Sequence, residues 1–190
     1  MGNPKVERDV VIDKLMEVFR SVGYDGASLA DLAAATGLKK ASLYHRFPEG
    51  KEAMAHAVLK HVADWNESEI VQILRSSEPA EARLISVLNS INVLYDGGRL
   101  ACILRALSHG TAAGLFRNEI AVIFQNWVVA FAHLATDFGH EPEISGRLAE
   151  STLIRIQGSL ILAQTLQQPN LFQSALNDIK SDFLKPSGKQ

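Results

Sequence analysis

Two short helical stretches on either side of a single glycine, Gly37, limit the folds that are open to this chain. Ser28, with Asp31 three residues later, is typical of a helix N-cap followed by an acidic first turn. A helix is therefore predicted over residues 29–36, and Gly37 ends it. Residues 39–46 are predicted to form a second short helix.

The residues around this glycine fit a helix-turn-helix. Two helices that cross at a tight turn need a small residue at their approach, a turn residue that tolerates a left-handed conformation, and apolar residues that hold the second helix. Ala33, Gly37, Leu38 and Leu43 meet these needs. The second helix would then lie in the major groove of DNA. The side chains placed to contact DNA are those of Lys39, Lys40, Ser42, Tyr44 and His45.

Each of these side chains also has a simpler interpretation. Tyr44 could cover the core of the N-terminal helices, because buried tyrosine is common where its hydroxyl finds a partner. His45 could be an ordinary surface histidine. Lys39 and Lys40 could be solvated charges, as most surface lysines are. The DNA interpretation therefore rests on the whole group of residues.

The remainder of the chain is also expected to be helical. Apolar residues at helical spacing predict a first helix over residues 5–22, and a long helix is predicted to start near Lys51. Glycine and proline breaks outline about six more helices, about nine in total. No stretch alternates between apolar and polar residues for long enough to predict a β-sheet. The expected fold class is all-α, with a three-helix head over residues 1–50 and a larger helical body over residues 51–190.

The charge distribution allows one short stretch to meet phosphates. The formal net charge is −2, which by itself argues against nucleic-acid binding. Residues 37–60, however, carry five basic and two acidic residues, a net charge of +3. These residues are Lys39, Lys40, Arg46, Lys51 and Lys60 against Glu49 and Glu52.

A single cysteine, Cys102, excludes a disulfide framework and a zinc site built from several cysteines. It suits a reducing compartment, so a cytoplasmic location is expected. No targeting leader is expected, and polar residues interrupt the apolar runs near 120–135 and 152–163, so no membrane partner is expected either. Arg99 and Arg105 could lower the pKa of the Cys102 thiol, which would permit a redox role. A small buried apolar residue is the alternative.

The full string from Ser28 to Lys51, SLADLAAATGLKKASLYHRFPEGK, closely resembles the N-terminal signature of TetR-family regulators. The resemblance implies that Ala41 and Ser42 approach the bases, that Tyr44 and His45 contact backbone or base edges, and that Lys51 reaches a phosphate. Phe47 would be a core residue. Phe47 and Lys51 are one residue further apart than in the commonest form of the signature. This longer spacing resembles that of the LmrA/YxaF branch. The residues expected at the DNA are Ser28, Lys39, Lys40, Ala41, Ser42, Tyr44, His45 and Lys51.

The resemblance also implies a ligand pocket in the helical body, where aromatic residues gather in mid-sequence. Ordinary core packing is the alternative, since pockets and cores use the same residue types. The segment around Cys102 resembles that of LmrA/YxaF regulators that respond to flavonoids and other planar aromatics, so a small hydrophobic effector is expected. The candidate pocket residues are Leu88, Ile91, Tyr95, Cys102, Leu107, Phe116, Phe124, Trp127 and Phe131.

The last two predicted helices, over residues 143–168 and 170–185, carry more apolar surface than one partner helix needs. In TetR-like proteins this pair forms a four-helix interface with a second copy, so a homodimer is expected. Packing within one chain is the alternative. Gly158, Ser159 and Ala163 would allow helices to approach closely.

No arrangement of residues indicates an enzyme. A nucleophile with its base and orienting group is missing, and His56 and His61 are poorly spaced for a shared metal ion. Neither a cofactor nor a metal is expected. The sequence thus predicts a ligand-responsive repressor that binds operator DNA as a homodimer. Two alternatives are a thiol- or electrophile-responsive regulator acting through Cys102 and a helical interaction protein that does not bind DNA.

Overall fold

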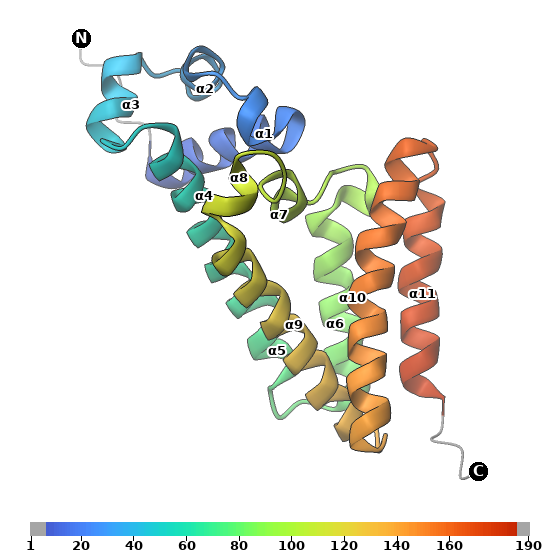
Figure 1. Cartoon of the computed structure of the whole chain (residues 1–190). Helices are drawn as coiled ribbons and strands as arrows, with labels where there is room; N and C mark the ends of the chain where they lie inside the picture. The colour runs from blue at the N-terminus through green and yellow to red at the C-terminus, as the bar shows by residue number, and fades with distance from the viewer. Residues whose placement is uncertain (1–6, 186–190) are drawn as a thin grey trace. The chain divides into compact units, whose positions relative to one another are not determined.

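The computed structural model describes residues 7–185, and within this range it contains helices and no strand. This confirms the all-α expectation (Figure 1). The elements are α1 (Arg8–Gly26), α2 (Leu29–Thr36), α3 (Lys40–Arg46), α4 (Lys51–Asn66), the π-helical η1 (Glu67–Val71), α5 (Gln72–Leu74), α6 (Ala80–Leu94), the 3₁₀-helical η2 (Asp96–Gly98), α7 (Ile103–Ala106), α8 (Ala112–Leu115), α9 (Arg117–Asp137), α10 (Pro142–Thr165) and α11 (Asn170–Leu184).

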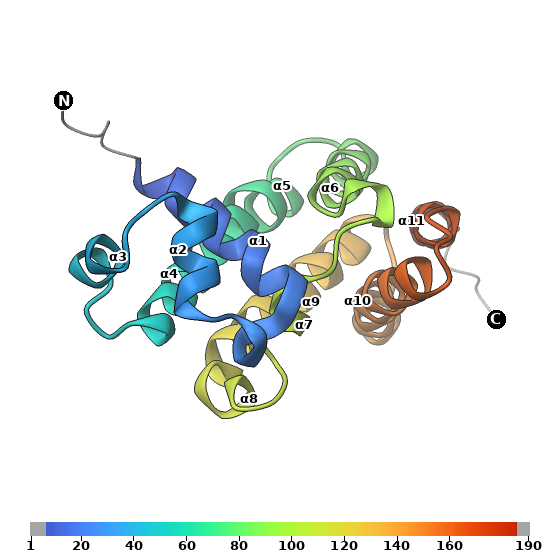
Figure 2. The same cartoon turned by 90° about the horizontal axis from the view of Figure 1, so that it is seen from above.

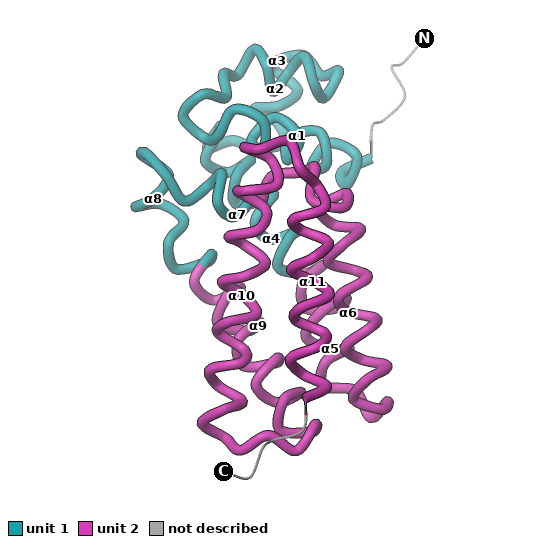
Figure 3. The backbone as a smooth tube through the Cα atoms, turned by 90° about the vertical axis from the view of Figure 1, so that its right-hand side faces the viewer, with its two compact units in different colours: residues 1–63, 103–120 teal, residues 64–102, 121–190 magenta. Residues whose placement is uncertain are grey.

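The chain divides into two compact units, which are coloured separately in Figure 3. Unit 1 comprises residues 1–63 and 103–120, and unit 2 comprises residues 64–102 and 121–190. The divisions fall within α4 and α9, so each of these helices contributes residues to both units. The boundary at residue 50, between a DNA-binding head and a helical body, stays a prediction.

Unit 1 is built around α1, which buries one apolar face. Val11, Leu15 and Phe19 follow one another at intervals of four residues and are fully buried, as an amphipathic helix requires. Helix α2 packs against α1 (Figure 2) and contributes the buried Leu32. Gly23 has a non-helical conformation inside α1, which separates a long first part from a short terminal turn.

Unit 2 contains three long helices, α6, α10 and α11, that lie side by side (Figures 1 and 3). The buried face of α10 includes Ile156 and Leu160, and that of α11 includes Phe172 and Ile179. Arg155 of α10 and Asp182 of α11 form an ion pair between the two helices. Apolar burial therefore holds α10 and α11 together within one chain.

Helix α9 supplies the aromatic core of unit 2. The Trp127 indole Nε1 donates a hydrogen bond of 2.6 Å to Asn66 Oδ1, and both groups are buried. Phe131 lies between Trp127 and Phe183, with ring centroids 6.2 and 6.1 Å away. By length and composition α9 could cross a membrane, but these buried aromatic residues are typical of a core helix.

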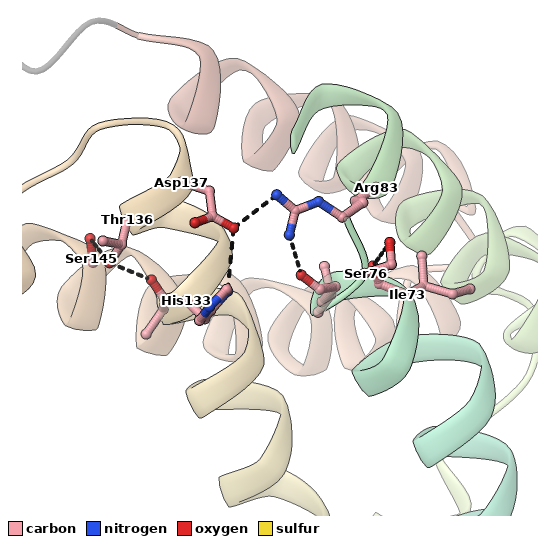
Figure 4. Close-up of polar contacts among 9 residues, drawn as sticks. Ile73, Ser76, Arg83, His133, Thr136, Asp137 and Ser145 are labelled. Carbon is pink, nitrogen blue, oxygen red and sulfur yellow. Dashed lines mark hydrogen bonds and ion pairs between the residues drawn. The ribbon is translucent and has the colours of Figure 1, made fainter. Parts of the chain in front are cut away.

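Arg83 of α6 joins three segments of unit 2. Its guanidinium donates to the backbone carbonyl of Leu74 at 2.7 Å and to the Asp137 carboxylate at 2.8 Å. Figure 4 shows this bridge, with His133 approaching the same carboxylate. The Arg83 side chain is buried, whereas Asp137 is about one-third exposed. The Leu74 carbonyl at the end of α5 therefore depends on Arg83 for a donor.

Replacing Arg83 with methionine should lower the free energy of unfolding by about 1–3 kcal/mol, because a buried carbonyl loses its donor. Urea unfolding followed by circular dichroism measures this loss. Arg147→Met is the matched control, since Arg147 forms an exposed ion pair with Glu143, and such pairs contribute about 0.5 kcal/mol or less. Equal effects of the two substitutions would contradict the role given to Arg83.

Candidate DNA-binding site

The start of α2 is fixed by a reciprocal cap between Ser28 and Asp31. The Asp31 backbone N–H donates to Ser28 Oγ at 3.1 Å, and the Ser28 backbone N–H donates to Asp31 Oδ2 at 3.1 Å. The Ser28 hydroxyl also donates to the same carboxylate, and these bonds lower the pKa of Asp31. This is a capping box, which satisfies two backbone donors at a helix end. The Ser28 hydroxyl is thus engaged within the protein.

The turn between α2 and α3 depends on the conformation of Gly37. Its backbone is left-handed, with φ 66° and ψ 13°, a region that glycine adopts without strain. The N–H groups of Gly37 and Leu38 each bond at 3.2 Å to a carbonyl in the last turn of α2, those of Ala34 and Ala33 respectively. These bonds satisfy carbonyls at the helix end and set the direction of α3.

Helix α3 is held by one buried residue, Leu43, and exposes its other residues except Arg46, which is partly buried. Leu43 is the buried residue of α3, and Phe47 just beyond it is buried too. Tyr44 is 45% exposed, which places most of its ring at the surface rather than over the core. The sequence-predicted residues that α3 and its N-cap bring together on an exposed surface are Lys39, Lys40, Ala41, Ser42, Tyr44 and His45.

The charge of this surface is positive. Lys39 and Lys40 open α3, His45 and Arg46 close it, and no acidic residue lies in its first turn. A broad depression of about 1020 Å³ borders the end of α3, and its lining combines the basic Arg8 and Arg46 with the acidic Glu7 and Asp9. Arg46 belongs to the basic stretch identified from the sequence but was not among the predicted DNA contacts, and Arg8 lies outside the helix-turn-helix pattern. Basic groups beside a recognition helix are suited to bind phosphates.

Lys51, at the first position of α4, binds the end of α1. Its ammonium donates to the carbonyl oxygens of Tyr24 at 2.9 Å and Ala27 at 3.1 Å, and it lies 4.4 Å from the centre of the Tyr24 ring. An ammonium group has three donors, so these two carbonyls leave one for another acceptor. Sequence analysis missed the two carbonyls, which are 27 and 24 residues away. A phosphate contact by Lys51 stays a prediction.

The same end of α1 contacts the segment between α7 and α8. Asp25 accepts hydrogen bonds from the backbone N–H of Thr111 at 3.0 Å and from the Thr111 hydroxyl. These two bonds lower the pKa of the Asp25 carboxyl. A Cβ atom at residue 110 would collide with this carboxylate, and the φ of Gly110 is +61°. Glycine is therefore required at position 110 by both space and conformation.

Aromatic contacts reinforce this region. Phe116 meets the Tyr24 ring at 5.3 Å and the His56 ring at 5.0 Å, both nearly edge-on. The His56 Nδ1 atom lies 2.9 Å from the Glu119 carboxylate. Burial is the main cause that raises the pKa of the Tyr24 hydroxyl. Residues 103–120 therefore pack with the DNA-binding helices in unit 1, which local sequence patterns did not indicate.

The candidate pocket residues fall into both units. Leu107 and Phe116 belong to unit 1, and the other seven belong to unit 2. Phe124 is half-buried. The remaining candidates are buried: Leu88, Ile91, Tyr95, Cys102, Leu107, Phe116, Trp127 and Phe131. In the structure these eight side chains are therefore packed in the interior.

Cys102 is 3% exposed, and its Sγ atom lies 3.6 Å from the Tyr95 hydroxyl. In this position it resembles a small buried apolar residue more than an exposed, reactive thiol. Within residues 7–185, no group of three His, Cys, Asp or Glu side chains is arranged to hold a metal ion.

Comparison with known proteins relates the same N-terminal region to a protein family. Residues 11–58 match the family model described as "Bacterial regulatory proteins, tetR family". The chain is 25% identical over 170 residues to the uncharacterized HTH-type transcriptional regulator YxaF of Bacillus subtilis, covering 83% of this chain and 85% of YxaF. It is 47% identical over 64 residues to the HTH-type transcriptional repressor ComR of Escherichia coli, covering 33% and 30% of the two chains.

Among solved structures, the fold is similar to that of the TetR family transcriptional regulator CifR, in a cysteine-substituted form bound to 26-base-pair operator DNA. The TM-score is 0.76 at 19% identity, and the match covers 95% of this chain and 98% of CifR. The residues that match the family model include the helix-turn-helix. Members of this family are transcriptional regulators rather than enzymes. Residues 11–58 therefore match the tetR family of bacterial regulatory proteins, and the fold of the whole chain is similar to that of a TetR-family regulator.

Proposed function

We propose that this regulator is a homodimeric repressor that binds operator DNA through α3 and is released by a small apolar or aromatic effector. The observation that carries the proposal is the exposed face of α3, where a single buried leucine leaves Lys39, Lys40 and Tyr44 free to reach a duplex. The repressor ComR, which is 47% identical over about a third of the chain, supports repression. CifR bound to operator DNA supports the binding mode.

The DNA-contacting residues of this proposal have distinct roles. Ala41 and Ser42 are small and approach the bases, whereas Tyr44 and His45 contact base edges or backbone. Lys39, Lys40 and the free donor of Lys51 contact phosphates. Ser28 acts by fixing the start of α2 through its cap.

The homodimer is supported by an exposed apolar stripe on α10. Ile154, Ile161, Leu162 and Leu166 are all substantially exposed, from 44% to 70%. Their spacing of seven, eight and twelve residues from Ile154 places them along one side of the helix. A Cβ atom at Gly158 would meet nothing within 4 Å, so another helix can approach there. Packing of two copies through this stripe would give a dimer with two α3 helices, as a helix-turn-helix protein needs to bind two half-sites.

Aromatic side chains in the body support an apolar effector. The set Trp127, Phe131 and Phe124 follows one side of α9, and Phe116 lies at its beginning. Because most of the candidate residues are buried, an effector enters by separating packed side chains rather than by filling an open space. Cys102 offers less support for a thiol-responsive regulator, because its sulfur is covered.

Replacing Lys40 with glutamine should weaken binding to every duplex alike and lower the slope of log affinity against log salt by about one, because one phosphate contact is lost. Fluorescence anisotropy with the intergenic DNA upstream of the gene and with an unrelated duplex measures both effects. Lys185→Gln, at the far end of α11, is the control. An unchanged salt slope for Lys40→Gln would contradict the assignment of this face of α3 to DNA binding.

The same titration separates the two roles of Lys51. Replacing Lys51 with methionine removes the donor from two carbonyls of α1, which should lower the free energy of unfolding by about 1–2 kcal/mol. A phosphate contact would also lower the salt slope by about one. A slope that matches the unaltered protein would show that Lys51 acts only within the fold.

The double replacement of Ile154 and Leu162 with glutamate should convert dimers to monomers. Each copy loses two apolar side chains from the interface, at a cost of at least about 3 kcal/mol, or a hundredfold in Kd. Sedimentation velocity measures the change. The control is Val93→Glu, because Val93 is 78% exposed on α6. Dimers that persist in the double variant, or that are equally lost in the control, would contradict the α10 interface.

A planar aromatic compound such as flavone should bind the body and release operator DNA. At ten times its Kd it should stabilise the protein by about 1.4 kcal/mol, which raises Tm by roughly 3–6 °C for a chain of this size. Thermal unfolding and anisotropy measure the two responses, with glucose as the control. A compound that raises Tm but leaves operator affinity unchanged would contradict release by that effector.

A further inference from the structure

A small groove lies between α6 and α11, and Leu88 is the one candidate pocket residue in its lining. Its volume is about 190 Å³, below the roughly 300–1,000 Å³ that is typical of pockets for drug-sized ligands. Apolar residues form part of the groove, and four amide side chains and one lysine form the remainder. The lining residues are Ile85, Leu88, Asn89, Asn92, Gln173, Leu176, Asn177 and Lys180.

The two helices run in opposite directions along the groove. Tyr95, just beyond α6, stacks edge-on with Phe172 at the start of α11, with ring centroids 5.8 Å apart. Asn92 and Gln173 therefore lie at one end, and Ile85 and Lys180 lie at the other. The eight residues from Gln173 to Lys180 span about 10 Å of helix. An occupant must be slender and about as long.

Lys180 gives one end of the groove a positive charge. No carboxylate is among the lining residues, and within residues 7–185 the Lys180 ammonium has no ion pair or hydrogen bond. Asp182, two residues on, is engaged by Arg155 and Lys185. It also points about 200° away around the helix axis. An anionic group of a ligand is therefore the partner that Lys180 lacks.

Asn92 gives the other end an unused acceptor. Its Oδ1 atom is buried and has no hydrogen-bond partner in the described part of the chain. Leaving such an atom without a donor costs free energy, which a ligand N–H or O–H group would recover. A complementary ligand therefore carries a negative charge at one end and a hydrogen-bond donor at the other.

We propose that the α6–α11 groove binds a slender carboxylic acid. Its carboxylate pairs with Lys180, its chain lies over Leu88 and Leu176, and a hydroxyl or amine at its far end donates to Asn92 Oδ1 once the amide turns toward the groove. This ligand differs in chemistry from the apolar effector proposed for the aromatic core. Its binding requires neither operator DNA nor that effector, so the two proposals can fail separately.

The test uses 6-hydroxyhexanoate as the probe, with hexanoate and 1,6-hexanediol as matched compounds that each lack one end group. Isothermal titration of the full chain should give the highest affinity for 6-hydroxyhexanoate. Two-dimensional NMR should show shifts at Asn92 and Lys180. Equal affinity for 1,6-hexanediol, or no binding of any of the three, would overturn the proposal without any variant.

Substitutions then assign the two ends. Lys180→Met should weaken 6-hydroxyhexanoate about tenfold or more, because a charge-assisted contact is lost. Asn92→Leu should remove the preference for 6-hydroxyhexanoate over hexanoate. Lys185→Met, on the same helix but outside the groove, should leave binding unchanged, and thermal unfolding checks that each variant is folded. Retained affinity in Lys180→Met, or retained preference in Asn92→Leu, would overturn the assignment.

Discussion

The ammonium group of Lys51 fixes the junction on which the DNA-binding helices depend. Its bonds to the Tyr24 and Ala27 carbonyls join the start of α4 to the end of α1. The carbonyls at a helix end have no partner inside the helix, so a cation placed there satisfies both hydrogen bonding and the helix dipole. Ala27 directly precedes Ser28, which caps α2. The position of α2, and through Gly37 that of α3, therefore follows from this junction.

Asp25 makes the same junction sensitive to residues 103–120. Its carboxylate is bound by Thr111, so a displacement of the α7–α8 segment must either move α1 with it or break these bonds. The pKa of Asp25 is lowered in the folded protein. Its contribution to stability is accordingly present above the pKa of the unfolded chain and is lost as the pH falls through the lowered value. At neutral pH the contact is fully formed.

Local sequence patterns predicted the helix-turn-helix because its determinants are close together in the chain. The Ser28 cap and Gly37 define residues 29–36 as a helix, and these are the bounds that the structure gives to α2. The partners of Lys51 and Asp25, and the Asp137 partner of Arg83, could not be predicted in this way, since they lie 24 to 86 residues apart. Sequence periodicity shows which face of a helix is apolar, but it does not identify the segment that covers that face.

The body illustrates a second limit, because core and pocket draw on the same side chains. The aromatic residues selected for a ligand site are packed against one another, as Phe131 is against Trp127 and Phe183. The sequence did not indicate the α6–α11 groove, because amide side chains on two helices distant in sequence resemble ordinary solvated residues. What distinguishes it is an unused charge and an unused acceptor at opposite ends of one hollow. Unsatisfied polar groups therefore indicate a ligand more specifically than apolar composition does, because they define the charge, the donor and the length of what would satisfy them.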